Sequence, residues 1–136
     1  MDKDFCPWAT AEELGVHVLY HPLRGARGCT NGTDTIWLDP RTTHLEQRMT
    51  LIHELTHICY GHTGHQPDAV EHHVRGYVAR FILKWEDIMQ YAEYQAPPHL
   101  IAEELGVTPD ILTDRLHHAT PAELHQLHRM RVHQWA

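Results

Sequence analysis

The apolar residues of this chain change their spacing at Asp39-Pro40, and this change constrains the fold more than any other feature. Before it, short segments alternate between apolar and polar residues, as half-buried strands do. After it, apolar residues recur every three or four positions, as they do along one face of an amphipathic helix. Strands followed by helices predict the α+β class, with a small N-terminal antiparallel sheet over 16–38 and a helical bundle after it.

The expected sheet is built around one tight turn. Residues 26–30 and 35–38 are expected to form strands, and Asn31-Gly32 between them is a dipeptide that favours a hairpin. Residues 16–23 begin with an alternating pattern, which predicts a further strand of the same sheet.

Helical spacing and capping signals divide the rest of the chain. Helices are expected over 8–14, 45–62, 68–94 and 97–133, the last range holding three short helices. The final helix follows Thr120, and Glu123 three residues later completes a capping box, in which both side chains bind helix N-terminal amides. A chain of 136 residues suits one domain, which we expect to cover 1–136.

The composition excludes several classes of function. The formal net charge is −7 with histidine neutral, whereas a protein that binds nucleic acid through its phosphates needs a basic surface. Three cysteines without a CxxC pair predict reduced thiols and no disulfide partner. No apolar run approaches the roughly twenty residues of a membrane span, and the acidic start is not typical of a signal peptide. We therefore expect a cytoplasmic protein with no nucleic-acid or membrane partner.

The helix expected over 45–62 contains His53-Glu54-Leu55-Thr56-His57, an HExxH motif. Residues i and i+4 lie on one face of a helix, so both imidazoles can reach one ion, and zinc suits imidazole ligands. Glu54 lies about 100° around the helix from His53. From there it can act as general base and general acid on a water at the metal. Most of the other histidines are interpreted as a titrating surface.

A third metal ligand is expected from the helix over 68–94. Glu71 precedes Val74 and Val78 by about one and two turns, so it shares their inward face. The alternatives that the sequence leaves open are His72, His73, His65 and Asp68. Two histidines and one carboxylate leave a fourth position for water, which is the arrangement of a catalytic zinc rather than a closed structural one.

Three segments resemble the ImmA/IrrE-type metallopeptidase family. Residues 48–57, RMTLIHELTH, are similar to its RFTLAHELGH segment, and residues 71–83 are similar to its ExxAxxFAxxLL pattern. Residues 101–116 resemble its IAxxFxVSxxxVxxRL segment. The resemblance covers roughly 8–118 and implies a zinc metallopeptidase of the HExxH, gluzincin-like type. It also implies a ligand set and a catalytic residue: His53, His57 and Glu71 on the zinc, and Glu54 as general base and acid.

The resemblance implies a protein substrate. The family includes phage and mobile-element proteases that cleave or antagonise a repressor, so we predict a zinc-dependent endopeptidase that acts on a transcriptional repressor. The alternative is a regulator that binds a repressor or other partner without cleaving it, its zinc being purely structural. A helix-turn-helix over 97–116 is a third interpretation, but the acidic side chains of this segment oppose DNA phosphates. The sequence does not choose the group that stabilises the oxyanion among Tyr60, Tyr77 and His72.

Overall fold

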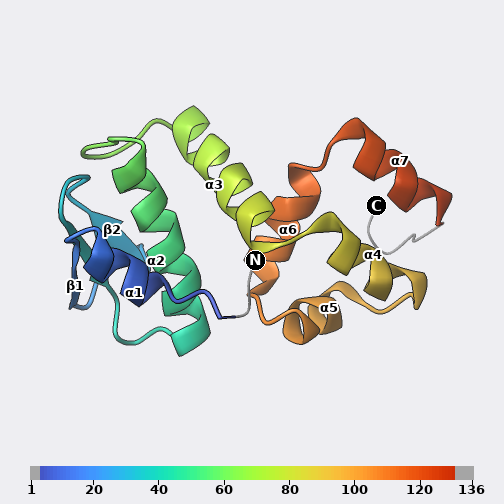
Figure 1. Cartoon of the computed structure of the whole chain (residues 1–136), viewed down its shortest axis with the longest axis horizontal. Coiled ribbons are helices and arrows are strands. Elements are labelled where there is room, and N and C mark those ends of the chain that lie inside the picture. Colours follow the sequence, from blue (N-terminus) through green and yellow to red (C-terminus); the bar gives the residue numbers. More distant parts are fainter. Residues whose placement is uncertain (1–3, 131–136) are drawn as a thin grey trace. The chain divides into compact units, whose positions relative to one another are not determined.

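The structure is a computed structural model of the chain, and it describes residues 4–130 (Figure 1). Its elements follow one another in the order α1 (Pro7–Glu13), β1 (His17–Tyr20), β2 (Gly28–Thr30), β3 (Thr35–Leu38), α2 (His44–Cys59), α3 (Asp68–Ile82), α4 (Trp85–Glu93), α5 (Pro98–Glu104), α6 (Pro109–His117) and α7 (Pro121–Arg129). Strands near the N-terminus and helices after them confirm the predicted α+β class.

The chain forms two compact units, one that ends at Val74 and one that begins at Arg75. The first unit holds α1, the sheet, α2 and the start of α3, and the second holds the rest of α3 and the helices after it. One domain over 1–136 stays a prediction.

The sheet has the strand order β1-β3-β2. Strands β2 and β3 are antiparallel, with Gly28 opposite Leu38, which confirms the hairpin around Asn31-Gly32. Strand β1 is parallel to β3, with Val18 opposite Ile36, so the expectation of an antiparallel sheet is wrong for this strand. Alternation indicates which side chains are buried, but it carries no information on strand direction. The sheet is mixed because its central strand, β3, has a parallel partner on one side and an antiparallel partner on the other.

The core of the first unit lies between the sheet and the helices α1 and α2. Its fully or nearly fully buried members are Ala11, Val16, Ile36, Leu38, Leu51 and Leu55. Burial of one such aliphatic side chain larger than alanine stabilises the fold by roughly 1.5–3 kcal/mol. Because Leu51 and Leu55 belong to this core, the part of α2 that carries the HExxH motif packs against the sheet.

The side chain of Asp39 connects the end of β3 to the segment before β2 and to the segment that leads into α2. Its carboxylate accepts hydrogen bonds from the backbone N–H of Leu23 at 3.0 Å and of Arg41 at 2.9 Å. It also pairs with the Arg41 guanidinium at 2.6 Å. Four residues on, Thr43 caps α2 in a reciprocal capping box with Glu46. These side-chain contacts define the end of β3 and the start of α2.

The single helix expected over 68–94 is wrong, because α3 ends at Ile82 and α4 begins at Trp85. The backbone carbonyl of Leu83 accepts a hydrogen bond at 2.9 Å from Nε of the buried Arg115. The same guanidinium makes two hydrogen bonds to the Glu123 carboxylate, at 3.0 and 2.7 Å, and lies over the Trp85 ring. The break is thus stabilised by a tertiary contact at residues that contain neither glycine nor proline.

The remaining helices lie close to their expected positions. The helix predicted over 45–62 ends at Cys59, and the capping box of Thr120 and Glu123 is present at the start of α7. Of the helical range 97–133, residues 131–133 lie outside the described residues. Among the helices that the structure describes, none combines the length and the apolar character needed to cross a membrane.

Candidate metal centre

Helix α2 brings two histidines of the HExxH motif together. His53 and His57 are one helical turn apart, and their Nε2 atoms lie 3.1 Å from each other. Their rings meet edge to face, with centroids 4.8 Å apart. The side chains of both residues therefore converge on one point beside the helix, as the spacing of four residues predicts.

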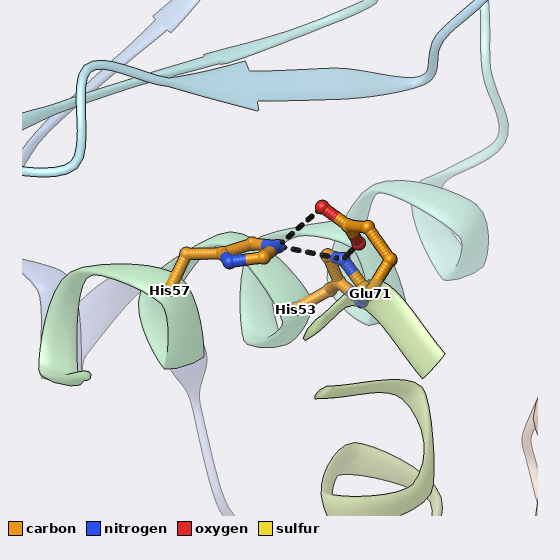
Figure 2. A group of neighbouring side chains, drawn as sticks. All are labelled: His53, His57 and Glu71. Carbon is orange, nitrogen blue, oxygen red and sulfur yellow. Dashed lines mark hydrogen bonds and ion pairs between the residues drawn. The ribbon is translucent and has the colours of Figure 1, made fainter. Parts of the chain in front are cut away.

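Glu71, in the first turn of α3, reaches the same point from the neighbouring helix (Figure 2). Its Oε2 lies 3.1 Å from Nε2 of His53, and its Oε1 lies 3.1 Å from Nε2 of His57. Figure 2 shows the three side chains pointing toward one another. In the described part of the chain, these three residues form a group with the spacing needed to hold a metal ion.

The chemistry of this donor set fits a divalent cation. Two imidazole Nε2 atoms in their metal-binding form and one carboxylate are all hydrogen-bond acceptors, so their lone pairs repel one another unless a cation lies between them. Ligand atoms about 2.0–2.1 Å from a tetrahedral zinc ion lie about 3.4 Å from one another. The observed separations of 3.1 Å are close to that value. Nitrogen and carboxylate ligands in a group of this size are typical of zinc.

The site is buried at His57 and partly open to solvent at His53 and Glu71. The side chain of His57 is 5% exposed, whereas those of His53 and Glu71 are 24% and 31% exposed. A cavity of about 510 Å³ begins at these residues. Its wall is formed by three short segments and the metal-site residues: Ala26 and Gly28–Thr30, His62, Gly64–Gln66, and His53, Glu54, His57 and Glu71. Strand β2, an outer strand of the sheet, thus borders the candidate metal position.

Glu54 lies in the cavity wall beside the two histidines. It is buried, and burial raises the pKa of its carboxyl group to about 7, with the nearby Glu71 carboxylate acting in the same direction. A cation bound between the three donors would act in the opposite sense, since an opposite charge favours the ionised carboxylate. Glu54 is thus a buried carboxyl group in the wall of the cavity, next to the three possible metal ligands.

His62 contacts the site, although its place in the sequence does not indicate a role. Helix α2 ends in a Schellman motif, in which Gly61 has φ +72° and its N–H donates to the Ile58 carbonyl at 3.0 Å. The N–H of His62 donates to the His57 carbonyl at 2.9 Å, and Nδ1 of His62 lies 3.1 Å from Nδ1 of His57. The sequence feature that could have predicted this contact is Gly61, because a glycine after a helix predicts that the next residue packs against the last turn.

The alternatives for the third ligand do not join His53 and His57 in the metal-binding group. His72, His73 and Asp68 are exposed and do not belong to the metal-binding group, and His65 is an exposed part of the cavity wall. Of the candidates for oxyanion stabilisation, Tyr60, Tyr77 and His72, none is among the described residues that line the cavity. Tyr60 instead stacks on the ring of His62, with centroids 5.6 Å apart. The cysteines Cys6, Cys29 and Cys59 are free thiols.

Comparison with protein families gives one result for this chain. The model of a family named Peptidase_M78, described as the IrrE N-terminal-like domain, matches residues 11–117. A search of curated proteins found no match, and a search of solved structures found none either. The matched range contains the whole sheet, α2 and all of the residues that form the candidate metal centre.

Proposed function

This chain belongs to the Peptidase_M78 family, and from this premise we propose that it is a zinc-dependent endopeptidase. The family implies peptidase activity, and the group of His53, His57 and Glu71 could bind a metal. The observation that carries the proposal is the convergence of these three donors beside a buried glutamate, in the wall of an open cavity.

We assign a separate role to each residue of the site. His53, His57 and Glu71 would hold the zinc ion, which when bound polarises a peptide carbonyl and lowers the pKa of water. Glu54 accepts a proton from the attacking water on its carboxylate and delivers it to the nitrogen of the departing peptide. The open side of the site leaves room for water and substrate, since His53 and Glu71 remain partly exposed.

Strand β2 supports a peptide as the substrate. It pairs with β3 alone in the described sheet, so its second edge has no strand partner. Gly28, Cys29 and Thr30 of this strand line the cavity. An extended peptide can add to such an edge through backbone hydrogen bonds. Its scissile bond would then lie between the strand and α2, which carries Glu54.

We propose a transcriptional repressor of a phage or mobile element as the substrate, and the cytoplasm as the place of action. This part of the proposal is supported by the resemblance of residues 48–57, 71–83 and 101–116 to the ImmA/IrrE-type sequences. An acidic protein is suited to act on such a substrate away from the DNA, because its net charge of −7 opposes binding to phosphates.

The test of this function compares the wild-type protein with Glu54→Gln. Both proteins are expected to contain about one zinc ion per chain by metal analysis, because Glu54 does not belong to the ligand group. Only the wild type should cleave fluorescein-labelled casein and the repressor encoded nearest to its gene. His53→Ala and Glu71→Ala should lose the zinc. Zinc retained in Glu71→Ala would remove Glu71 from the ligand set.

A repression assay with the same two proteins tests the non-proteolytic alternative. A regulator with a structural zinc would relieve repression in the Glu54→Gln variant as well as in the wild type. Structural zinc sites usually have four protein ligands, whereas the group in the described residues has three and is open on one side. We therefore expect relief of repression to disappear together with cleavage.

A further inference from the structure

Each ring nitrogen of His57 faces a different part of the site. Its Nε2 lies 3.1 Å from both Nε2 of His53 and Oε1 of Glu71. Its Nδ1 lies 3.1 Å from Nδ1 of His62. The side chain of His57 is 5% exposed, so water has little access to the ring. A buried ring nitrogen without a hydrogen-bond partner costs about 1–3 kcal/mol.

We propose that His62 is a positioning residue of the metal centre, which accepts a hydrogen bond from Nδ1–H of His57. A neutral imidazole carries one proton. When that proton is on Nδ1 and directed at His62, Nε2 of His57 presents its lone pair to the metal. Histidine ligands of metal ions usually donate their other N–H to a second group, which fixes the tautomer and the ring orientation. The proposal rests on the proposed function, because it requires a metal at His53, His57 and Glu71.

The structure favours a positioning role for His62 over a role as a further ligand. Its Nδ1 faces Nδ1 of His57, on the side of that ring away from Glu71. It is also not a member of the group whose donor atoms all lie within 4.8 Å of one another. His62 therefore acts on the metal through His57.

Two further contacts hold His62 in place. Its backbone N–H is bonded to the carbonyl of His57, and its ring stacks on Tyr60 with an angle of 15° between the planes. The acceptor is thus held by both the end of α2 and an aromatic neighbour. A side chain that is already ordered loses little conformational entropy when His57 binds the metal.

The experiment measures zinc affinity by competition with a chromogenic chelator in four proteins: the wild type, His62→Leu, His62→Asn and His65→Leu. Leucine and asparagine have nearly the same shape, but only asparagine offers an acceptor near the position of Nδ1. His65→Leu is the matched control, because His65 lies in the same loop and lines the same cavity. The visible absorption of bound Co²⁺ gives a second readout, which does not depend on catalysis.

We expect His62→Leu to lower zinc affinity about 10–100-fold and to alter the Co²⁺ spectrum. His62→Asn should recover most of the affinity, and His65→Leu should stay close to the wild type. Unchanged affinity in His62→Leu, or equal losses in His62→Leu and His62→Asn, would overturn the role of His62. Absence of zinc binding by the wild type overturns the proposed function itself. If His62→Leu does not fold by circular dichroism, His62→Phe replaces it, since phenylalanine keeps the stack on Tyr60 but has no acceptor.

Discussion

Gly32, in the turn between β2 and β3, lies directly against the backbone of His62. A Cβ atom on Gly32 would overlap the carbonyl oxygen of His62 and would approach Cα of Thr63 to 2.7 Å. The hairpin turn and the loop after α2 therefore touch at a point where no side chain fits. This contact joins the sheet to the segment that holds His62 beside His57.

Replacing Gly32 with alanine should destabilise the protein for two reasons. The residue has φ +77°, which costs an alanine about 1–2 kcal/mol, and its Cβ would force the two segments apart. Gly25→Ala is the matched control, because Gly25 has φ +70° but open space around its Cβ position. We expect losses in the free energy of unfolding of about 1 kcal/mol for Gly25→Ala and about 2–4 kcal/mol for Gly32→Ala, measured in urea. Equal losses in the two variants would show that the loop simply moves aside.

Arg115 should be among the residues most sensitive to substitution in the second unit. It is buried, and it holds both the Leu83 carbonyl and the Glu123 carboxylate. Arg115→Ala leaves these acceptors without their donor and should cost about 3 kcal/mol in unfolding free energy. The control is Arg129→Ala, because Arg129 is exposed at the end of α7 and its substitution removes the same charge. This variant should change the free energy of unfolding by less than about 0.5 kcal/mol. A loss below about 1 kcal/mol for Arg115→Ala would contradict this account of the break between α3 and α4.

The two errors in the expected fold have the same kind of physical origin. The apolar spacing of residues 16–23 predicts a strand, but the direction of that strand depends on which neighbour it meets, and the neighbour is β3 rather than β2. The spacing over 68–94 predicts a continuous helix, and Val78 and Ile82 on its apolar face are both buried as it requires. The helix nevertheless ends there, stabilised by Arg115 from more than thirty residues away. Local patterns carry no information on contacts of that range.

The part of the candidate site that lies on helices could be predicted from the sequence, whereas the part that lies in the loop after α2 could not. The spacing of His53 and His57 gives their convergence directly, and the inward face shared with Val74 and Val78 brings Glu71 to the same point. The HExxH spacing does not indicate His62, because that motif covers only residues 53–57. Its contact with His57 depends on the left-handed conformation of Gly61, which reverses the chain after α2.

Acid should weaken the fold partly through Asp39. Its hydrogen bonds and ion pair with Arg41, together with the Leu23 amide, hold the pKa of this carboxyl well below its usual range. A carboxyl whose pKa is lower in the folded state stabilises the fold at pH values above its unfolded pKa of about 4, and this contribution is lost as the pH falls toward the native pKa. Asp39→Asn should therefore be less stable than the wild type at pH 6, with the difference shrinking below about pH 4. The check is a series of urea unfolding curves between these conditions, and a difference that does not depend on pH would contradict the assignment.

Zinc should stabilise both compact units if the chain is a single domain, as we propose. Helix α3 contains Glu71 before the boundary at Val74 and continues to Ile82 beyond it. Because helix formation is cooperative, unfolding of one unit should unfold this shared helix and the other unit with it. A ligand that binds only the folded state adds about 4 kcal/mol to the free energy of unfolding when its free concentration is a thousand times its dissociation constant.

In hydrogen exchange followed by mass spectrometry, saturating zinc should therefore slow the most protected amides of α6 as much as those of α2. Protection that rises in α2 but stays unchanged in α6 would mean that the two units unfold separately, and His53→Ala should abolish the effect in both.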